Sequence, residues 1–133
     1  MLDPRLESWM RSAHEIGIVE FNDADLVASR FPYDIPEYYT PIGLFESDAL
    51  CIDVETKEIC VLDHEVKDRK LCVAAQNQES FVTAMLLVQE YFDDCAHDLE
   101  SHDETSAEAI AVECTRLAGG DQFRSFFCSL IGA

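Results

Sequence analysis

The chain has 133 residues, of which 27 are acidic and nine are Lys or Arg, so its formal net charge is −18. This length fits one domain with one core, and a hydrophobic fraction of 48% argues against a disordered chain. The charge argues against direct binding of nucleic acid, because phosphate recognition needs clustered Lys and Arg side chains. We expect one domain over residues 1–133, with a basic protein as its natural partner.

No membrane span or secretory signal is visible in the sequence. The longest apolar-rich run, residues 81–92, is interrupted by Thr83, Gln89 and Glu90, and a transmembrane helix needs about 20 apolar residues. The first residues lack the basic start and apolar centre of a signal peptide. We therefore expect a cytoplasmic protein that does not contact a membrane.

The first third of the chain predicts one long helix and then a loop. A helix is expected over residues 4–17, because Pro4 is tolerated in an opening turn and apolar residues up to Ile16 recur at helical spacing. A short helical or irregular segment is expected near residues 23–28. Three prolines in residues 31–41 hinder a helix and favour an extended loop.

The middle of the chain predicts an antiparallel meandering sheet. Residues 49–54 and 58–63 are rich in β-forming residues and are joined by a short turn, which predicts a central hairpin. Apolar residues at both parities of the first strand indicate that both of its faces are covered. Leu50, Ile52, Ile59 and Val61 should be buried. Strands are also expected near residues 42–46 and 71–75.

The last third predicts three helices. Asn77 is a suitable N-cap for a long helix over residues 78–96, whose apolar residues follow the 3, 4, 7 spacing. Further helices are expected over 106–118, ending at a Gly-Gly pair, and over 121–131. Because the order is helices, sheet, helices, without strand–helix alternation, we expect an α+β fold.

The six cysteines lie in apolar, strand-like or helical runs, which is how free cysteine behaves as a small buried hydrophobe. We therefore expect six reduced thiols. The absence of a Cys-x-x-Cys pair argues against a structural zinc site. The residues concerned are Cys51, Cys60, Cys72, Cys95, Cys114 and Cys128.

The sequence nominates no catalytic residue and no cofactor. Its five glycines never take a phosphate-binding spacing. Cys95 and His97 are two apart on a predicted helix, so they face different directions. His97 and His102 lie among the acids of residues 93–104, which is compatible either with a divalent-metal site or with a solvated acidic face. We expect a protein that is not an enzyme and holds no metal.

Residues 42–63 resemble the central segment of the SUKH superfamily. In that segment a glycine-led strand precedes an aliphatic-x-aliphatic-Asp motif, here Leu50-Cys51-Ile52-Asp53, followed by a Thr-Gly-Glu-type turn and a second strand. Thr56-Lys57-Glu58 departs from the usual glycine in the turn. Residues 77–82 are similar to the polar cap before the family's Phe-aliphatic helix, and Phe126-Phe127 stands where many members place an aromatic pair.

This resemblance implies an α+β immunity protein, made beside a polymorphic bacterial toxin, which neutralises that toxin by binding it in the cytoplasm. Members share no catalytic residues, and the acidity suits a toxin with a basic surface. Two alternatives remain open. One is a general interaction or regulatory module of the same fold, and the other is a metal-dependent hydrolase centred on residues 93–104.

The partner-binding surface is expected within residues 31–48, where acidic and aromatic side chains are concentrated. Tyrosine supplies contact area with little loss of entropy, and carboxylates steer a basic partner. The alternative is that the tyrosines cover a sheet edge and the acids only solvate a loop. The residues expected to contact the partner are Tyr33, Asp34, Glu37, Tyr38, Tyr39, Glu46 and Asp48.

Overall fold

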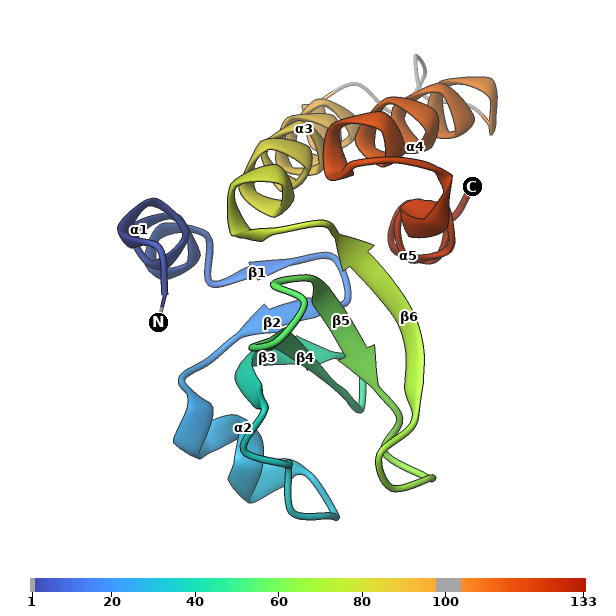
Figure 1. The fold of residues 1–133 in the computed structure, drawn as a ribbon. Helices are drawn as coiled ribbons and strands as arrows, with labels where there is room; N and C mark the ends of the chain where they lie inside the picture. Colours follow the sequence, from blue (N-terminus) through green and yellow to red (C-terminus); the bar gives the residue numbers. More distant parts are fainter. Residues whose placement is uncertain (1, 98–103) are drawn as a thin grey trace.

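A six-stranded antiparallel sheet lies between helices in the computed structural model, which describes residues 2–97 and 104–133 (Figure 1). This arrangement confirms the predicted α+β fold. The helices are α1 (Pro4–Ala13), α2 (Ala24–Arg30), α3 (Gln78–His97), α4 (Glu104–Ala118) and α5 (Arg124–Ile131), with a single 3₁₀ turn, η1 (Asp121–Phe123). The strands are β1 (Glu15–Ile16), β2 (Val19–Phe21), β3 (Tyr39–Phe45), β4 (Asp48–Asp53), β5 (Ile59–Leu62) and β6 (Lys70–Ala75).

Each strand pairs with the next one along the chain, so the sheet is a meander in the order β1 to β6. The predicted hairpin is formed by β4 and β5, both of which lie inside the sheet, with Leu50 opposite Val61 and Ile52 opposite Ile59. These four side chains are at most 5% exposed. The central hairpin and its buried residues are therefore confirmed.

The two faces of the sheet carry separate apolar clusters. Helices α3, α4 and α5 cover one face, where Phe81 and Phe126 are fully buried, while α2 lies on the opposite side (Figure 1). On that second side Val27 of α2 packs with Cys51 and Cys60 from neighbouring strands. The two-sided coverage expected for β4 is thus confirmed.

The helix expected over residues 4–17 is too long by four residues. Helix α1 ends at Ala13, and the chain then forms the short hairpin of β1 and β2. His14 and Gly17 both adopt positive φ angles, of 57° and 58°, which a right-handed helix cannot accommodate. Ile16 is buried as a strand residue, so its helical spacing from the earlier apolar residues was coincidental.

Strand β3 begins three residues earlier than predicted, inside the segment that its prolines marked as loop. Pro41 lies at a register shift between β3 and β4, a position where a strand tolerates proline because no ladder hydrogen bond is required there. The expected irregular or helical segment near residues 23–28 is helix α2, whose N-cap Asp23 accepts the Leu26 backbone N–H at 2.8 Å. The helix predicted over 121–131 begins as the 3₁₀ turn η1 and continues as α5 from Arg124, and the remaining predicted elements differ from the observed bounds by two residues or fewer.

Gly43 of β3 has a packing role. A Cβ atom at this position would lie 2.4 Å from the backbone carbonyl oxygen of Glu20 in β2, which is closer than non-bonded atoms can approach. The glycine therefore allows β2 to pair against β3, where Phe21 faces Gly43.

All six cysteines are free thiols in the structure, as expected. Cys51 and Cys60 face each other across β4 and β5 and are fully buried. Among the described helices, none is long and apolar enough to cross a lipid bilayer.

Candidate functional site

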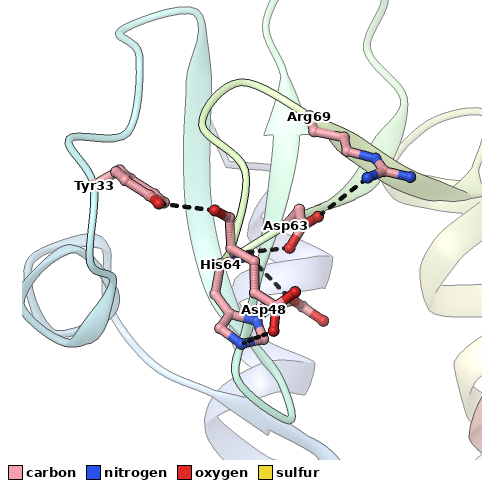
Figure 2. Close-up of polar contacts among 6 residues, drawn as sticks. Tyr33, Asp48, Asp63, His64 and Arg69 are labelled. Atoms are coloured by element: carbon pink, nitrogen blue, oxygen red, sulfur yellow. Dashed lines mark hydrogen bonds and ion pairs between the residues drawn. The ribbon is translucent and has the colours of Figure 1, made fainter.

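A cluster of polar side chains lies where β4 begins and β5 ends (Figure 2). Ala49 pairs with Leu62 in the β4–β5 ladder, so Asp48 and the residues that follow β5 are brought together. We call this group the His64 cluster. It consists of Tyr33, Asp48, Asp63, His64, Glu65 and Arg69.

Asp48 and His64 form the centre of the His64 cluster. One carboxylate oxygen of Asp48, Oδ1, accepts the His64 backbone N–H at 3.0 Å and lies 2.7 Å from Nδ1 of the imidazole. The hydrogen bond to Asp48 raises the pKa of His64, and the charges of Asp48, Glu65 and Asp63 raise it further against a smaller opposing effect of desolvation. The two contacts between Asp48 and His64 therefore join the loop after β5 to the β3–β4 hairpin.

Asp63 and Tyr33 hold the same loop from its other sides. Asp63 is buried, and its Oδ1 accepts the Glu65 backbone N–H at 2.8 Å, while Oδ2 lies 3.9 Å from the Arg69 guanidinium. The Tyr33 hydroxyl donates to the Glu65 carbonyl at 2.8 Å. Tyr33 thus ties the segment after α2 to the loop after β5 (Figure 2).

The His64 cluster contains three possible metal ligands, Asp48, Asp63 and His64, but their geometry is that of an ion pair. One atom each from Asp48, Asp63 and His64 can be chosen so that all three lie within 4.8 Å. However, Nδ1 and Oδ1 are only 2.7 Å apart, whereas two ligands at about 2.1 Å from a zinc ion lie about 3 Å or more from each other. Arg69 also supplies a cation beside Asp63.

A second set of exposed side chains lies at the opposite end of β3 and β4. The Val54 backbone N–H donates to the Tyr38 carbonyl at 2.9 Å, so the two residues are neighbours. The Tyr38 side chain is 47% exposed and the Val54 side chain 42%. Exposed Glu37 and Glu55 flank them, and neither carboxylate bonds to another described residue. We call these four residues the Tyr38 patch.

The turn that carries Val54 is held by Asp53. This buried carboxylate accepts the backbone N–H groups of Glu55 at 2.9 Å and Thr56 at 3.2 Å through Oδ1, and the Lys70 ammonium at 2.9 Å through Oδ2. Burial alone would raise the pKa of Asp53, but the hydrogen bonds from Lys70, Thr56 and Glu55 outweigh it and lower the pKa.

The Asp53–Lys70 ion pair also contacts the aromatic side chains next to the Tyr38 patch. The Lys70 ammonium lies 5.8 Å from the centroid of the Tyr39 ring, within the range of a cation–π contact. The Tyr39 ring in turn lies 4.9 Å from the ring of Tyr38. Asp53, Lys70, Tyr39 and Tyr38 therefore form a continuous series of contacts that ends at an exposed aromatic ring.

The residues expected to bind a partner lie at two separate places. Glu46 and Asp48 lie at the β3–β4 turn, near Tyr33 and the His64 cluster, whereas Glu37, Tyr38 and Tyr39 lie at the other end of β3. Seven residues of β3 separate these ends by about 20 Å. Asp34, Glu37 and Glu46 are exposed, while Tyr33 and Asp48 are half-buried and engaged in the His64 cluster.

Sequence reasoning missed Val54 and Glu55 as members of a surface with Tyr38. The only signal for their proximity is the β3–β4 register, in which Tyr39 faces Asp53. The proposed metal ligands among residues 93–104 fall largely outside the described residues, because 98–103 are not described. Within that segment, Asp93 and Asp94 are exposed on α3.

A cleft of about 530 Å³ lies between α1 and the start of β3. Met10, Phe21 and Ile42 line it, and two of its charged residues, Arg11 and Glu7, already pair with each other at 2.6 Å. None of the seven residues expected to bind a partner lines this cleft. Neither a family model, nor a curated protein, nor a solved structure matches the chain.

Proposed function

We propose that this protein is an immunity protein, which binds a cognate bacterial toxin in the cytoplasm and neutralises it without catalysing a reaction. The toxin presents a basic surface to it. The resemblance of residues 42–63 to the SUKH superfamily supports this proposal. Two of the matching positions also have clear physical roles here, because Gly43 admits β2 and Asp53 holds the turn after β4.

The observation that carries the proposal is that the protein's few cations are mostly paired with its own acids. Six of the nine Lys and Arg side chains lie within 4.0 Å of a carboxylate, which leaves most of the exposed carboxylates among the described residues without a cation. Such a surface attracts a basic protein over long range and accelerates its association. The paired cations are Arg11, Arg30, Arg69, Lys70, Arg116 and Arg124.

The residues expected to contact the toxin divide into two kinds. Asp34, Glu37 and Glu46 are exposed and form no side-chain bond to another described residue, so their charge is directed to solvent. Tyr33 and Asp48 hold the loop after β5, and we assign them a positioning role in the interface. Exposed carboxylates contribute little to folding, so their number is better explained by recognition of a partner.

The experiment is co-expression with the product of the gene immediately upstream. We expect the two proteins to purify together in a fixed ratio and the chain to protect cells from that product. Replacing Asp34, Glu37 and Glu46 together with Lys should weaken the complex while the melting temperature stays nearly constant. A charge-matched control replaces exposed Glu79, Glu90 and Asp94 of α3 with Lys. If no complex forms and no protection is seen, the proposed function is wrong.

A further inference from the structure

We infer that the Tyr38 patch is the docking point for an arginine side chain of the basic partner, with the guanidinium stacked on the Tyr38 ring and paired with Glu37 and Glu55. This inference rests on the proposed function in one respect, namely that the partner is a basic protein. It adds where that partner binds and which of its side chains is recognised.

The first argument is that this patch exposes an aromatic residue and an aliphatic residue that are neighbours across two strands. Tyr38 and Val54 are adjacent through a backbone hydrogen bond, yet their side chains are 47% and 42% exposed. Single exposed apolar residues are common, but contiguous ones ringed by polar groups mark interaction sites. Tyrosine is one of the residue types most enriched in binding hot spots.

The second argument is rigidity. The turn after β4 is fixed by three hydrogen bonds to the Asp53 side chain and by the Lys57 N–H, which donates to the Asp53 carbonyl at 2.8 Å. The Tyr38 ring is held against Tyr39. A surface that is already ordered loses little conformational entropy when a partner binds. The patch is therefore preorganised.

The third argument concerns the kind of cation. Arginine stacks on aromatic rings and binds carboxylates with a planar fork of donors, whereas lysine presents a compact, strongly hydrated charge. Glu37 precedes Tyr38 and Glu55 follows Val54 in the chain, and both are exposed and form no side-chain bond to another described residue. The neighbouring Tyr39 ring already receives an internal cation, Lys70. The exposed Tyr38 ring offers the same interaction to an external one.

The first test uses peptides and does not require a toxin. Penta-arginine and penta-lysine are titrated into ¹⁵N-labelled protein at about 0.15 M salt, where screening weakens diffuse attraction. We expect penta-arginine to shift the amides of Tyr38, Val54 and Glu55 most, and to bind at least about threefold more tightly than penta-lysine. Tyr38→Leu keeps the apolar area but removes the ring, and it should abolish that preference.

The matched control for the peptide test is Val112→Ser, because Val112 on α4 is 50% exposed and lies outside the patch. It should leave both peptide affinities unchanged, whereas Val54→Ser should weaken penta-arginine binding. Equal binding of the two peptides, or largest shifts on α3 near Asp93 and Asp94, would overturn the inference.

The second test measures toxin binding and separates the two proposals. If the upstream product binds and Tyr38→Leu weakens it at least about threefold while Val112→Ser does not, the inference is supported. If the toxin binds all variants equally, the proposed function stands and the docking point is wrong. If no toxin binds, the proposed function fails, and the peptide titration alone decides whether the patch recognises arginine.

Discussion

Lys70 of β6 places its ammonium 2.9 Å from a carboxylate oxygen of Asp53 in β4, although β5 lies between the two strands. The pair joins the ends of two non-adjacent strands. Asp53 also caps the turn that carries Val54. One ion pair therefore stabilises both the sheet and the shape of the Tyr38 patch.

Replacing Lys70 with Met should destabilise the protein by about 2 to 3 kcal/mol, because it leaves a buried carboxylate without its cation. The side chain of Asp53 is only 9% exposed, which limits compensation by water. Urea unfolding at pH 7 measures the change. The control is Arg116→Met, which breaks an exposed pair with Glu113 and should leave the unfolding midpoint nearly unchanged.

The same ion pair predicts a defined pH window. The pKa of Asp53 is lowered in the folded protein, so its stabilising effect is present above its unfolded pKa, about 3.9, and is lost as the pH falls through the folded pKa. Lys70 loses solvation on burial, but its partners outweigh this and raise its pKa. Its contribution is therefore present below about pH 10.4 and is lost as the pH rises through the folded pKa. The free-energy difference between wild type and Asp53→Asn should shrink toward both limits.

His64 predicts a second pH effect, of opposite sign to that of Asp53. Its pKa is raised by Asp48, so the stabilisation it provides is full below its unfolded pKa, about 6.5, and is lost as the pH rises through the folded pKa. An NMR titration of the imidazole should show a raised pKa in wild type and a value closer to 6.5 in Asp48→Asn. Equal titration in both proteins would contradict the contact with Asp48.

Lys57→Gly should stabilise the protein by about 0.5 to 1 kcal/mol, because Lys57 adopts a φ of 72° that glycine tolerates without steric cost. In the SUKH superfamily segment that residues 42–63 resemble, this position of the turn is usually glycine. The control is Lys57→Ala, which removes the same charge and side chain but keeps the strained backbone. Thermal unfolding should therefore rank Gly above Ala, and an equal effect of the two would assign the gain to charge.

Gly43→Ala should cost about 2 to 3 kcal/mol, because the added methyl group would meet the Glu20 carbonyl oxygen and force β2 away from β3. Chemical denaturation measures this loss. A methyl-sized change elsewhere in the same hairpin, Ser47→Ala in the exposed β3–β4 turn, should stay within about 0.5 kcal/mol of wild type.

The three buried thiols, Cys51, Cys60 and Cys114, should be free but unreactive in the folded protein. Burial raises the pKa of Cys60 and Cys114 to about 12 and raises that of Cys51 as well, which leaves almost no thiolate at neutral pH. Iodoacetamide should therefore spare these three until the protein is unfolded. Mass spectrometry after unfolding without reductant should then show six alkylated cysteines, and a deficit would indicate a disulfide.

The sheet and the C-terminal helices could be predicted because their signals are local. Residues 49–63 contain two β-rich apolar runs joined by a short turn, and the apolar residues from Phe81 to Cys95 recur at helical spacing. The sequence did not predict the β1–β2 hairpin, because Ile16 falls at helical spacing from the apolar residues of α1. Gly17, which has a positive φ, lies in the turn between β1 and β2.

The sequence predicted which segment carries the candidate site, but it did not predict which residues of the site lie together. Composition indicated an acidic, aromatic segment, but strand register decides which of its residues lie together. Nothing near Tyr38 in the sequence points to Val54, and nothing near Asp53 points to Lys70. Both contacts require the fold.

The meander has a consequence for how the protein reaches its native state. Every strand pairs with the one before it, and the longest connection within the sheet, residues 22–38, contains α2. Each pairing step therefore closes a short loop at little entropic cost, and local topology of this kind speeds folding. The chain should fold faster than a β-sandwich of equal length, whose strands must find partners far apart in the sequence.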